Sequence, residues 1–142
     1  MIEIVPSTLD HARRLQLRHG DACEVAACGL SKEDAIAQSL ARSLWAETYL
    51  VDGEVAAMVG LAVSSVIAGH GVPWLLTGPA CERHKRRFMV ESRRQVARML
   101  EQASPLVNYV HADYGRAVRW LEWLGFRIGP PQGGFRRIFK EV

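Results

Sequence analysis

A run of basic side chains has the plainest chemical meaning in this sequence. Residues 83–98 read RHKRRFMVESRRQVAR, and a smaller basic group follows at Arg136, Arg137 and Lys140. Clustered Lys and Arg attract phosphate, whether of a nucleotide cofactor, a nucleic acid or a lipid. For any single residue of the run, a solvated place on a helix face is the simpler interpretation. The run therefore predicts a phosphate partner without identifying it.

The candidate general bases are Glu47, His70 and His111. An imidazole titrates near neutral pH, so a histidine in a cleft can accept a proton from a substrate. A surface or satisfied histidine is the simpler interpretation of His70 and His111. Cys81 stands at an expected helix start next to Arg83, which favours a lowered thiol pKa, but a small buried thiol without a base partner is the ordinary role.

The cysteines give no sign of a metal site. Cys23, Cys28 and Cys81 are odd in number, lack the spacing of metal ligands and have no accompanying His cluster. Free cysteines are typical of a reduced compartment, so a cytoplasmic location is expected.

The hydrophobic pattern of the first half predicts the elements that position these side chains. Ile2–Val5 is expected as a strand, and Ser7 with Asp10 forms a capping box for a helix over about 8–19. A second capping box starts another helix. Its members and the apolar stripe that follows are Ser31, Asp34, Ile36, Leu40 and Leu44. A hairpin then joins residues 47–51 and 54–63, because Asp52-Gly53 suits a tight turn.

The second half of the chain predicts a long helix among short strands. The expected elements are a loop over 70–73, a strand over 74–77, a helix over 80–103, a strand over 106–110, a helix over 115–124 that Gly125 ends, a strand over 126–128, a turn region over 130–134 and a last strand over 135–142. The resulting order is β-α-α-β-β-β-α-β-α-β-β.

Composition indicates one globular domain over residues 1–142. The chain is 49% hydrophobic and 23% charged, with a formal net charge of +3, and a chain of this length buries enough surface for one core. No stretch of 18 apolar residues is present, and the start MIEIVPST has neither the basic nor the apolar region of a signal peptide. Neither a membrane span nor a second domain is expected.

The segment ADYGRAVRWLEWLGF at 112–126 resembles the C-terminal segment of the GNAT (GCN5-related N-acetyltransferase) superfamily. Ala117 matches the alanine of the family pattern, Trp120 its aromatic position and Gly125-Phe126 its ending. The element order along essentially the whole chain is also similar to that family. The resemblance implies an α+β fold with α/β/α layers and a mixed, mostly antiparallel sheet flanked by helices.

A narrower resemblance joins four segments. VPWLLTG at 72–78, SRRQVARML at 92–100, LVNYV at 106–110 and RAVRWLEWLGF at 116–126 look like small phage-encoded GNAT-like proteins, one of them tied to virion assembly. This resemblance implies a phage or prophage gene and phage structural proteins as partners.

The family resemblance implies an acetyl-CoA site whose pyrophosphate lies at the start of the long helix. The corresponding stretch, residues 77–84, keeps the small residues Gly78 and Ala80, but Pro79 removes an N–H donor and Glu82 opposes a phosphate. A purely structural helix start at Pro79 is the competing interpretation. The cofactor-binding residues expected are Leu76, Thr77, Gly78, Arg83, His84, Lys85, Arg87 and Asn108.

The resemblance also implies a tyrosine that protonates the departing CoA thiolate, but Leu121 occupies that position. Tyr114 and Tyr109 are the alternatives, and Tyr114, His111 and Glu47 form the expected catalytic set. In LVNYV, the amide of Asn108 serves either the pantetheine arm or a neighbouring backbone group.

Two functions follow from these residues. One is acetyl transfer from acetyl-CoA to an unidentified amine; the other is a catalytically inactive GNAT-fold virion or assembly protein acting through protein contacts. The basic helix alone is weak support for nucleic-acid binding, because no binding motif accompanies it. Trp120 and Trp123 share a helix face, and either one is a partner anchor, in an oligomer or with another protein, if it stays exposed.

Overall fold

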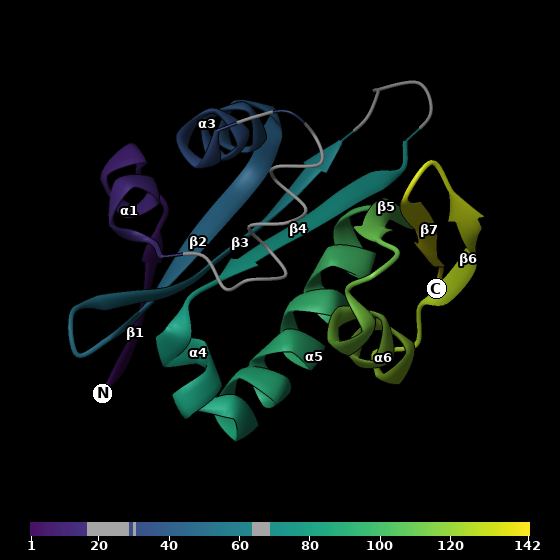
Figure 1. The fold of residues 1–142 in the computed structure, drawn as a ribbon. Helices are drawn as coiled ribbons and strands as arrows, with labels where there is room; N and C mark the ends of the chain where they lie inside the picture. Colours follow the sequence, from purple (N-terminus) through teal and green to yellow (C-terminus); the bar gives the residue numbers. More distant parts are fainter. Residues whose placement is uncertain (17–28, 30, 64–68) are drawn as a thin grey trace.

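The computed structural model describes residues 1–16, 29, 31–63 and 69–142. Figure 1 shows a sheet with α1 and α3 on one side and α4, α5 and α6 on the other. The elements are β1 (Ile2–Pro6), α1 (Leu9–Arg14), α3 (Lys32–Arg42), β2 (Ser43–Val51), β3 (Glu54–Val63), β4 (Gly71–Thr77), α4 (Pro79–Arg83), α5 (Lys85–Gln102), β5 (Leu106–His111), α6 (Gly115–Trp123), β6 (Arg127–Gln132) and β7 (Phe135–Lys140). The expected layered α+β fold is confirmed.

The sheet is open in its middle. Its seven described strands follow the order β1-β2-β3-β4-β5-β7-β6, and every neighbouring pair is antiparallel except β4 with β5. These two parallel strands share one registered pair, Gly71 with Leu106, and the Gly71 N–H donates to the Pro105 carbonyl oxygen at 2.9 Å. The strands separate beyond that point, and this opening positions the candidate site.

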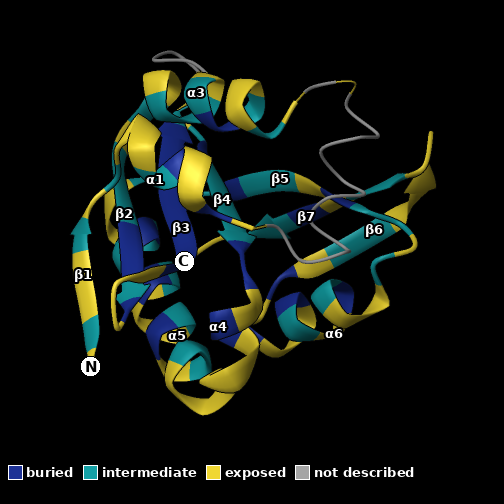
Figure 2. Cartoon of the chain, turned by 60° about the vertical axis from the view of Figure 1, so that its left-hand side comes forward, coloured by how far each residue is buried: buried dark blue, intermediate teal, exposed yellow. Residues whose placement is uncertain are grey.

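The two faces of the sheet carry separate cores. Leu75 packs against the cluster of α5, α6, β5 and β7, whereas Trp74 and Leu76 pack against the cluster of α1, α3 and β3. Successive side chains of a strand point to opposite faces, so these contacts place α3 and α5 on opposite sides of β4. Figure 2 shows β3 buried along most of its length between them, as expected for a central strand.

The start of α1 differs from the expected capping box. Thr8, not Ser7, is the N-cap: its hydroxyl accepts from the His11 N–H at 3.2 Å, and the Thr8 N–H donates to His11 Nδ1 at 3.1 Å. The Ser7 hydroxyl instead bonds to the buried Thr48 hydroxyl at 2.8 Å. The helix ends at Arg14, and residues 17–19 of the expected helix lie outside the described residues.

The next helix and hairpin follow the prediction with one shift. Ser31 caps α3 by accepting from the Asp34 N–H at 3.1 Å. The helix ends at Arg42, so Leu44 lies on β2 with 61% of its surface exposed and does not continue the apolar stripe. The tight turn is confirmed, because Asp52 and Gly53 have φ of 49° and 83°.

The long helix is broken at His84, whose backbone (φ −119°, ψ 39°) leaves the helical region between α4 and α5. The strand before it begins at Gly71, where a loop was expected. Near the C-terminus, Pro130 and Pro131 belong to the edge strand β6, and only Gly133-Gly134 makes the turn. An edge strand tolerates proline because one row of its N–H groups has no partner strand.

Candidate functional site

A cavity of about 1170 Å³ occupies the opening between β4 and β5. Its walls include residues of α3 and residues of α4, α5 and α6. Because α3 and α5 cover opposite faces of the sheet (Figure 1), the cavity passes through the sheet between the two strands. The cavity therefore opens a path between the two faces of the sheet.

Trp74 forms the β4 wall of this passage. Its indole Nε1 donates to the Ser43 hydroxyl at 2.8 Å. The ring lies against Gly60 of β3, where an added Cβ would meet indole atoms at 2.5 Å. Gly60 therefore makes room for the ring, and Ser43 fixes its orientation.

Asn108 joins the two strands across the opening. Its side-chain Nδ2 donates to the Pro73 carbonyl oxygen, and its Oδ1 accepts from the Tyr109 N–H at 2.7 Å. Both ends of the amide are thus used within the protein. The structure gives Asn108 the neighbouring-backbone role, which also limits how far β4 and β5 separate.

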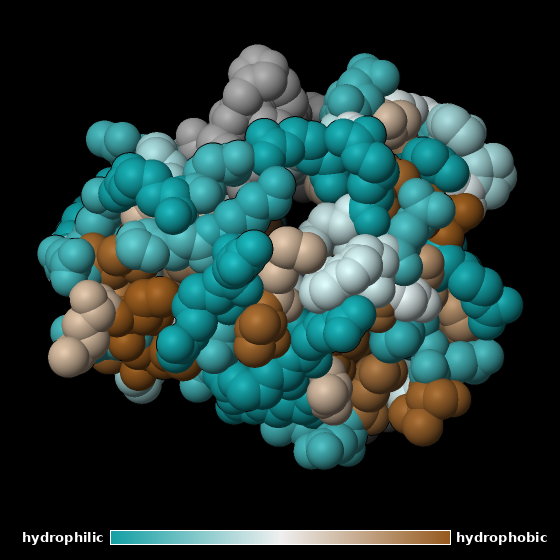
Figure 3. All heavy atoms as spheres, turned by 90° about the horizontal axis from the view of Figure 1, so that it is seen from below, coloured by the Kyte–Doolittle hydropathy of each residue, from teal (hydrophilic) through white to brown (hydrophobic). Residues whose placement is uncertain are grey.

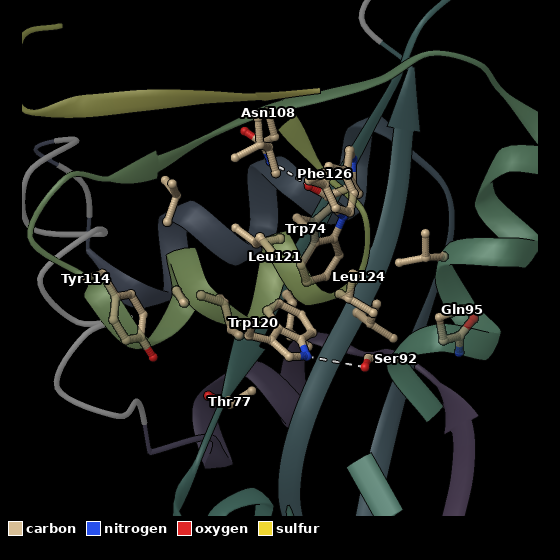
Figure 4. A pocket seen from close by; sticks show the side chains of 18 of the residues that line it. Trp74, Thr77, Ser92, Gln95, Asn108, Tyr114, Trp120, Leu121, Leu124 and Phe126 are labelled. Atoms are coloured by element: carbon tan, nitrogen blue, oxygen red, sulfur yellow. Dashed lines mark hydrogen bonds between the residues drawn. The ribbon is translucent and has the colours of Figure 1, made fainter. Parts of the chain in front are cut away.

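The wall between α5 and α6 is mostly apolar. Trp120 Nε1 donates to the Ser92 hydroxyl at 3.3 Å, as the dashed line in Figure 4 shows. Leu121 also lines the cavity but is 8% exposed and belongs to the core cluster. A leucine has no proton to donate, so this position supplies no acid.

The mouth of the cavity on the side of α4, α5 and α6 carries both negative and positive side chains. Glu82 of α4 pairs with Arg116 of α6 at 2.6 Å, and both line the cavity. The hydrogen bond to Glu82 and its charge raise the pKa of Arg116. Lys85 and Arg119 also line the mouth and have no ion-pair partner in the described part of the chain. Figure 3, which views the molecule from below, shows hydrophilic residues over much of this face.

The expected cofactor-binding residues divide into two groups. Those that line the cavity are Leu76, Thr77, Lys85 and Asn108; those that do not are Gly78, Arg83, His84 and Arg87. The Gly78 N–H donates to the Ala56 carbonyl oxygen at 2.8 Å. Arg83 pairs with Glu54 at 3.0 Å, and Arg87 with Glu91 at 3.7 Å.

The expected catalytic residues divide in the same way. Tyr114, the N-cap of α6, lines the cavity. Glu47 does not: its carboxylate accepts from Gln95 at 2.8 Å and pairs with Arg98 at 3.0 Å.

The two histidines also lie outside the cavity lining. His111 Nδ1 accepts from the Asp113 N–H at 3.2 Å, and its ring stacks edge-on against Phe135 at 5.6 Å. His70 precedes β4 at the end of the opening where Gly71 pairs with Leu106.

A buried polar cluster lies where β2 meets α5, and it was not predicted from the sequence. The Tyr49 hydroxyl donates to Glu91 at 3.1 Å and accepts from Gln95 at 2.9 Å. Burial raises the pKa of Tyr49, and the charge of Glu91 adds to that shift. Gln95 Oε1 is buried and has no partner in the regions that the structure describes. Only Glu91, an acid inside the basic run, hints at this cluster in the sequence.

Two kinds of site are not found in the described ranges. No group of three or more His, Cys, Asp or Glu side chains there is arranged to hold a metal ion. None of the described helices is long and apolar enough to span a membrane.

The fold matches solved acetyltransferase structures. An acetyltransferase from Thermus thermophilus has a TM-score of 0.70 and 15% identity over 99% of this chain and 97% of its own. The paiA N-acetyltransferase of Thermoplasma acidophilum, in complex with coenzyme A, has 0.64 and 15% over 100% and 99%. The yncA protein of Salmonella typhimurium, with its cofactor acetyl-CoA, has 0.62 and 13% over 98% and 91%. No protein-family model and no curated protein sequence matches the chain. At these identities the comparison establishes the GNAT fold.

Proposed function

We propose that this chain, which has the GNAT acetyltransferase fold, transfers an acetyl group from acetyl-CoA to an amine. The observation that carries the proposal is the cavity that crosses the sheet between β4 and β5. Such a passage lets a thioester from the α5 side meet an amine from the α3 side. Similar solved structures hold coenzyme A and acetyl-CoA, which supports this assignment of the cavity.

The residues present fit acetyl-CoA through strand edges and side-chain cations. Beyond Gly71, β4 has no registered partner on β5, so its backbone can bond pantetheine amides as a neighbouring strand would. Leu76 and Thr77 lie on this stretch and line the cavity. Lys85 and Arg119, which line the mouth, are the cations that can bind the phosphates.

The helix start contributes less than the GNAT resemblance implies. Pro79 has no N–H, and the Gly78 N–H is already used by Ala56. The phosphates would therefore depend on side-chain charge, including Arg116 once it leaves Glu82.

Tyr114 is the general acid of this proposal. The amine nitrogen attacks the thioester carbonyl carbon, the C–S bond breaks, and the sulfur leaves as a thiolate that a phenol O–H can protonate. Tyr114 is the member of the expected catalytic set that lines the cavity. Glu47 and His111 do not line the cavity, and the carboxylates that do, Glu82 and Glu91, are paired with Arg116 and Arg94. In this proposal the amine therefore enters in its neutral form after losing its proton to water. When the amide forms, the nitrogen loses one more proton, which passes through water to the Tyr114 phenolate and restores the phenol.

Calorimetric titration with acetyl-CoA tests the binding step. We expect saturable binding that weakens about fivefold or more in Lys85→Gln/Arg119→Gln, because each lost phosphate contact removes a charge-assisted hydrogen bond. Arg83→Gln is the matched control, since Arg83 pairs with Glu54 outside the cavity lining. Tyr114→Phe should keep the affinity and lower the rate of CoA release with an amine acceptor. Equal affinity in the double variant and the control would contradict the proposed site.

The competing function is a GNAT-fold scaffold that binds no acyl-CoA. Leu121 in the core and the Glu82–Arg116 pair across the mouth favour it. No heat of binding and no thermal stabilisation at millimolar acetyl-CoA would make it the better account. The phage origin, phage partners, possible oligomer and cytoplasmic location stay predictions.

A further inference from the structure

One face of α3 lines the cavity on that side of the sheet. The residues of α3 that line the cavity follow the spacing i, i+3, i+4 and i+7: Ala35, Gln38, Ser39 and Arg42. This spacing places them on one face of the helix. The buried Ile36 and the partly buried Leu40 belong instead to the core below α3. We call the four lining residues the α3 stripe.

Arg42 gives the α3 stripe a positive charge. Its side chain is exposed and has no hydrogen bond or ion pair to any residue that the structure describes. The other charged residues that line the cavity lie on α4, α5 and α6: Glu82, Lys85, Glu91, Arg116 and Arg119. Among the described residues that line the cavity, therefore, no carboxylate lies on the α3 side beside Arg42.

The strands facing the α3 stripe add neutral side chains. Tyr109 of β5, Gln132 of β6 and Phe135 of β7 line the cavity, and Tyr109 is 59% exposed. Aromatic walls with one cation suit a small ligand that carries a negative group, whereas a diamine or polyamine would find no opposite charge there.

The stripe is held at a fixed distance from the passage. The Ser39 hydroxyl donates to the Ala35 carbonyl oxygen at 2.9 Å, and the Ser43 hydroxyl donates to the Ser39 carbonyl oxygen. Ser43 in turn accepts from Trp74 Nε1. These bonds join the last turn of α3, which carries Arg42, to the ring that walls the passage.

The helix dipole offers a simpler explanation for an arginine at position 42. A cation in the last turn of a helix is favoured by the helix dipole, and this alone accounts for an exposed arginine. The dipole does not explain why Arg42 and Gln38 share the face that lines the cavity. That placement is what points to a ligand.

We propose that the acceptor is an amine whose far end carries an oxyanion, and that Arg42 binds this oxyanion with help from Gln38. A guanidinium offers two parallel N–H donors to a carboxylate or a phosphate. The amino group then points from the α3 side toward the passage beside Trp74. This inference rests on the proposed acetyl transfer and names the acceptor class for the same site.

Matched primary amines test the inference by direct binding, with and without acetyl-CoA. The probes are 4-aminobutanoate, 4-aminobutanamide and 1,4-diaminobutane, which differ at one end only, together with 2-aminoethyl phosphate. The readout is the Trp74 indole N–H signal in a ¹H–¹⁵N spectrum. We expect 4-aminobutanoate or 2-aminoethyl phosphate to shift it at concentrations about tenfold lower than the amide and the diamine, as one charge-assisted contact predicts. Their relative strength shows whether carboxylate or phosphate is preferred.

Three variants distinguish a specific effect of Arg42 from the effect of the protein's net charge. Arg42→Gln should abolish the preference, and Gln38→Glu should weaken anion binding by placing a carboxylate one turn away. Arg13→Gln on α1 is the control: it makes the same change of charge outside the cavity lining. Melting temperatures should stay close to that of the unchanged protein, because the Arg42 side chain makes no hydrogen bond or ion pair with described residues that it would lose.

Each outcome decides the inference. Equal or tighter binding of the diamine, an unchanged preference in Arg42→Gln, or no shift with any probe would overturn it. Anion binding at Trp74 without acetyl-CoA binding would keep the oxyanion site and reject the proposed transferase. Acetyl-CoA binding without anion preference would reject the oxyanion site and keep the transferase.

Discussion

The ion pair between Glu82 and Arg116 would compete with cofactor binding. Their ion pair at 2.6 Å crosses the cavity mouth, where a cofactor phosphate would need the same arginine. The phosphates of CoA together carry more charge than one carboxylate and can displace it, but only at a cost to affinity. The pair therefore tunes cofactor binding if the cavity takes acetyl-CoA.

Glu82→Gln should tighten acetyl-CoA binding by about twofold to fivefold, because an exposed ion pair of this kind contributes modestly. Arg116→Gln should weaken binding, since it removes a donor. Calorimetry on both variants checks the signs. The control is Glu54→Gln, which frees Arg83 outside the cavity lining and should leave the affinity unchanged.

Some of the residues predicted from the sequence lie at the cavity. Tyr114, Lys85 and Thr77 line it, and their catalytic and cofactor-binding roles stay predictions. Glu47 does not line it, because Arg98 and Gln95 hold its carboxylate at α5. Those partners lie about fifty positions away, so no local pattern predicts them. Side-chain direction on a strand depends on register, which the sequence around Glu47 leaves open.

The cap of α1 links the helix to pH. His11 Nδ1 must be unprotonated to accept from the Thr8 N–H. Burial lowers the pKa of His11, and the charge of Arg14 lowers it further. The unfolded chain therefore binds this proton more readily than the folded one. The stabilisation is present above the unfolded pKa of about 6.5 and is lost as pH falls through the folded pKa.

His11→Gln should reduce the loss of stability between neutral pH and mildly acidic pH. Glutamine at this position can accept the same hydrogen bond without titrating. Chemical denaturation across the pH range, compared with the unchanged protein, measures the difference. An identical pH dependence in both proteins would contradict the role given to His11.

The β3–β4 pair depends on one glycine. A Cβ at Gly60 would lie 2.5 Å from the Trp74 indole, on a wall that Ser43 also fixes. Gly60→Ala should lower the free energy of unfolding by about 1 to 3 kcal/mol, as overpacking of a core does. Thermal unfolding checks the loss, and Gly60→Ala combined with Trp74→Leu should recover part of it. A Gly60→Ala protein as stable as the original would show that the ring has room to move.

The presence of each helix and strand was easier to predict than the residue at which it begins or ends. The capping box predicted the α3 start, and Asp52-Gly53 predicted the hairpin turn. The Ser31 cap and the positive φ angles of Asp52 and Gly53 confirm both. The break at His84 was missed because its neighbours are good helix formers. Tertiary packing prevails there: Ala80 and Cys81 are buried, while residues 82–87 are exposed. The end of α3 before Leu44 was missed because the apolar spacing continues into β2.

For the whole molecule, the prediction of the fold rested on the segment 112–126 and on the order of the elements. The fold matches that of an acetyltransferase from Thermus thermophilus with a TM-score of 0.70, although the identity is only 15%. Order and periodicity survive such divergence because they need only hydrophobic positions, not particular residues. The opening between β4 and β5, by contrast, depends on three-dimensional pairing and became visible only in the structure.

The four tryptophans can report separately on the position proposed for acetyl-CoA in that opening. Trp74, Trp120 and Trp123 line the cavity, Trp123 is 41% exposed, and Trp45 lies outside the lining. A ¹H–¹⁵N titration with acetyl-CoA should shift the indole signals of Trp74 and Trp120 and leave Trp45 unchanged. No shift at saturating acetyl-CoA, or a shift of Trp45 alone, would contradict this position of the cofactor.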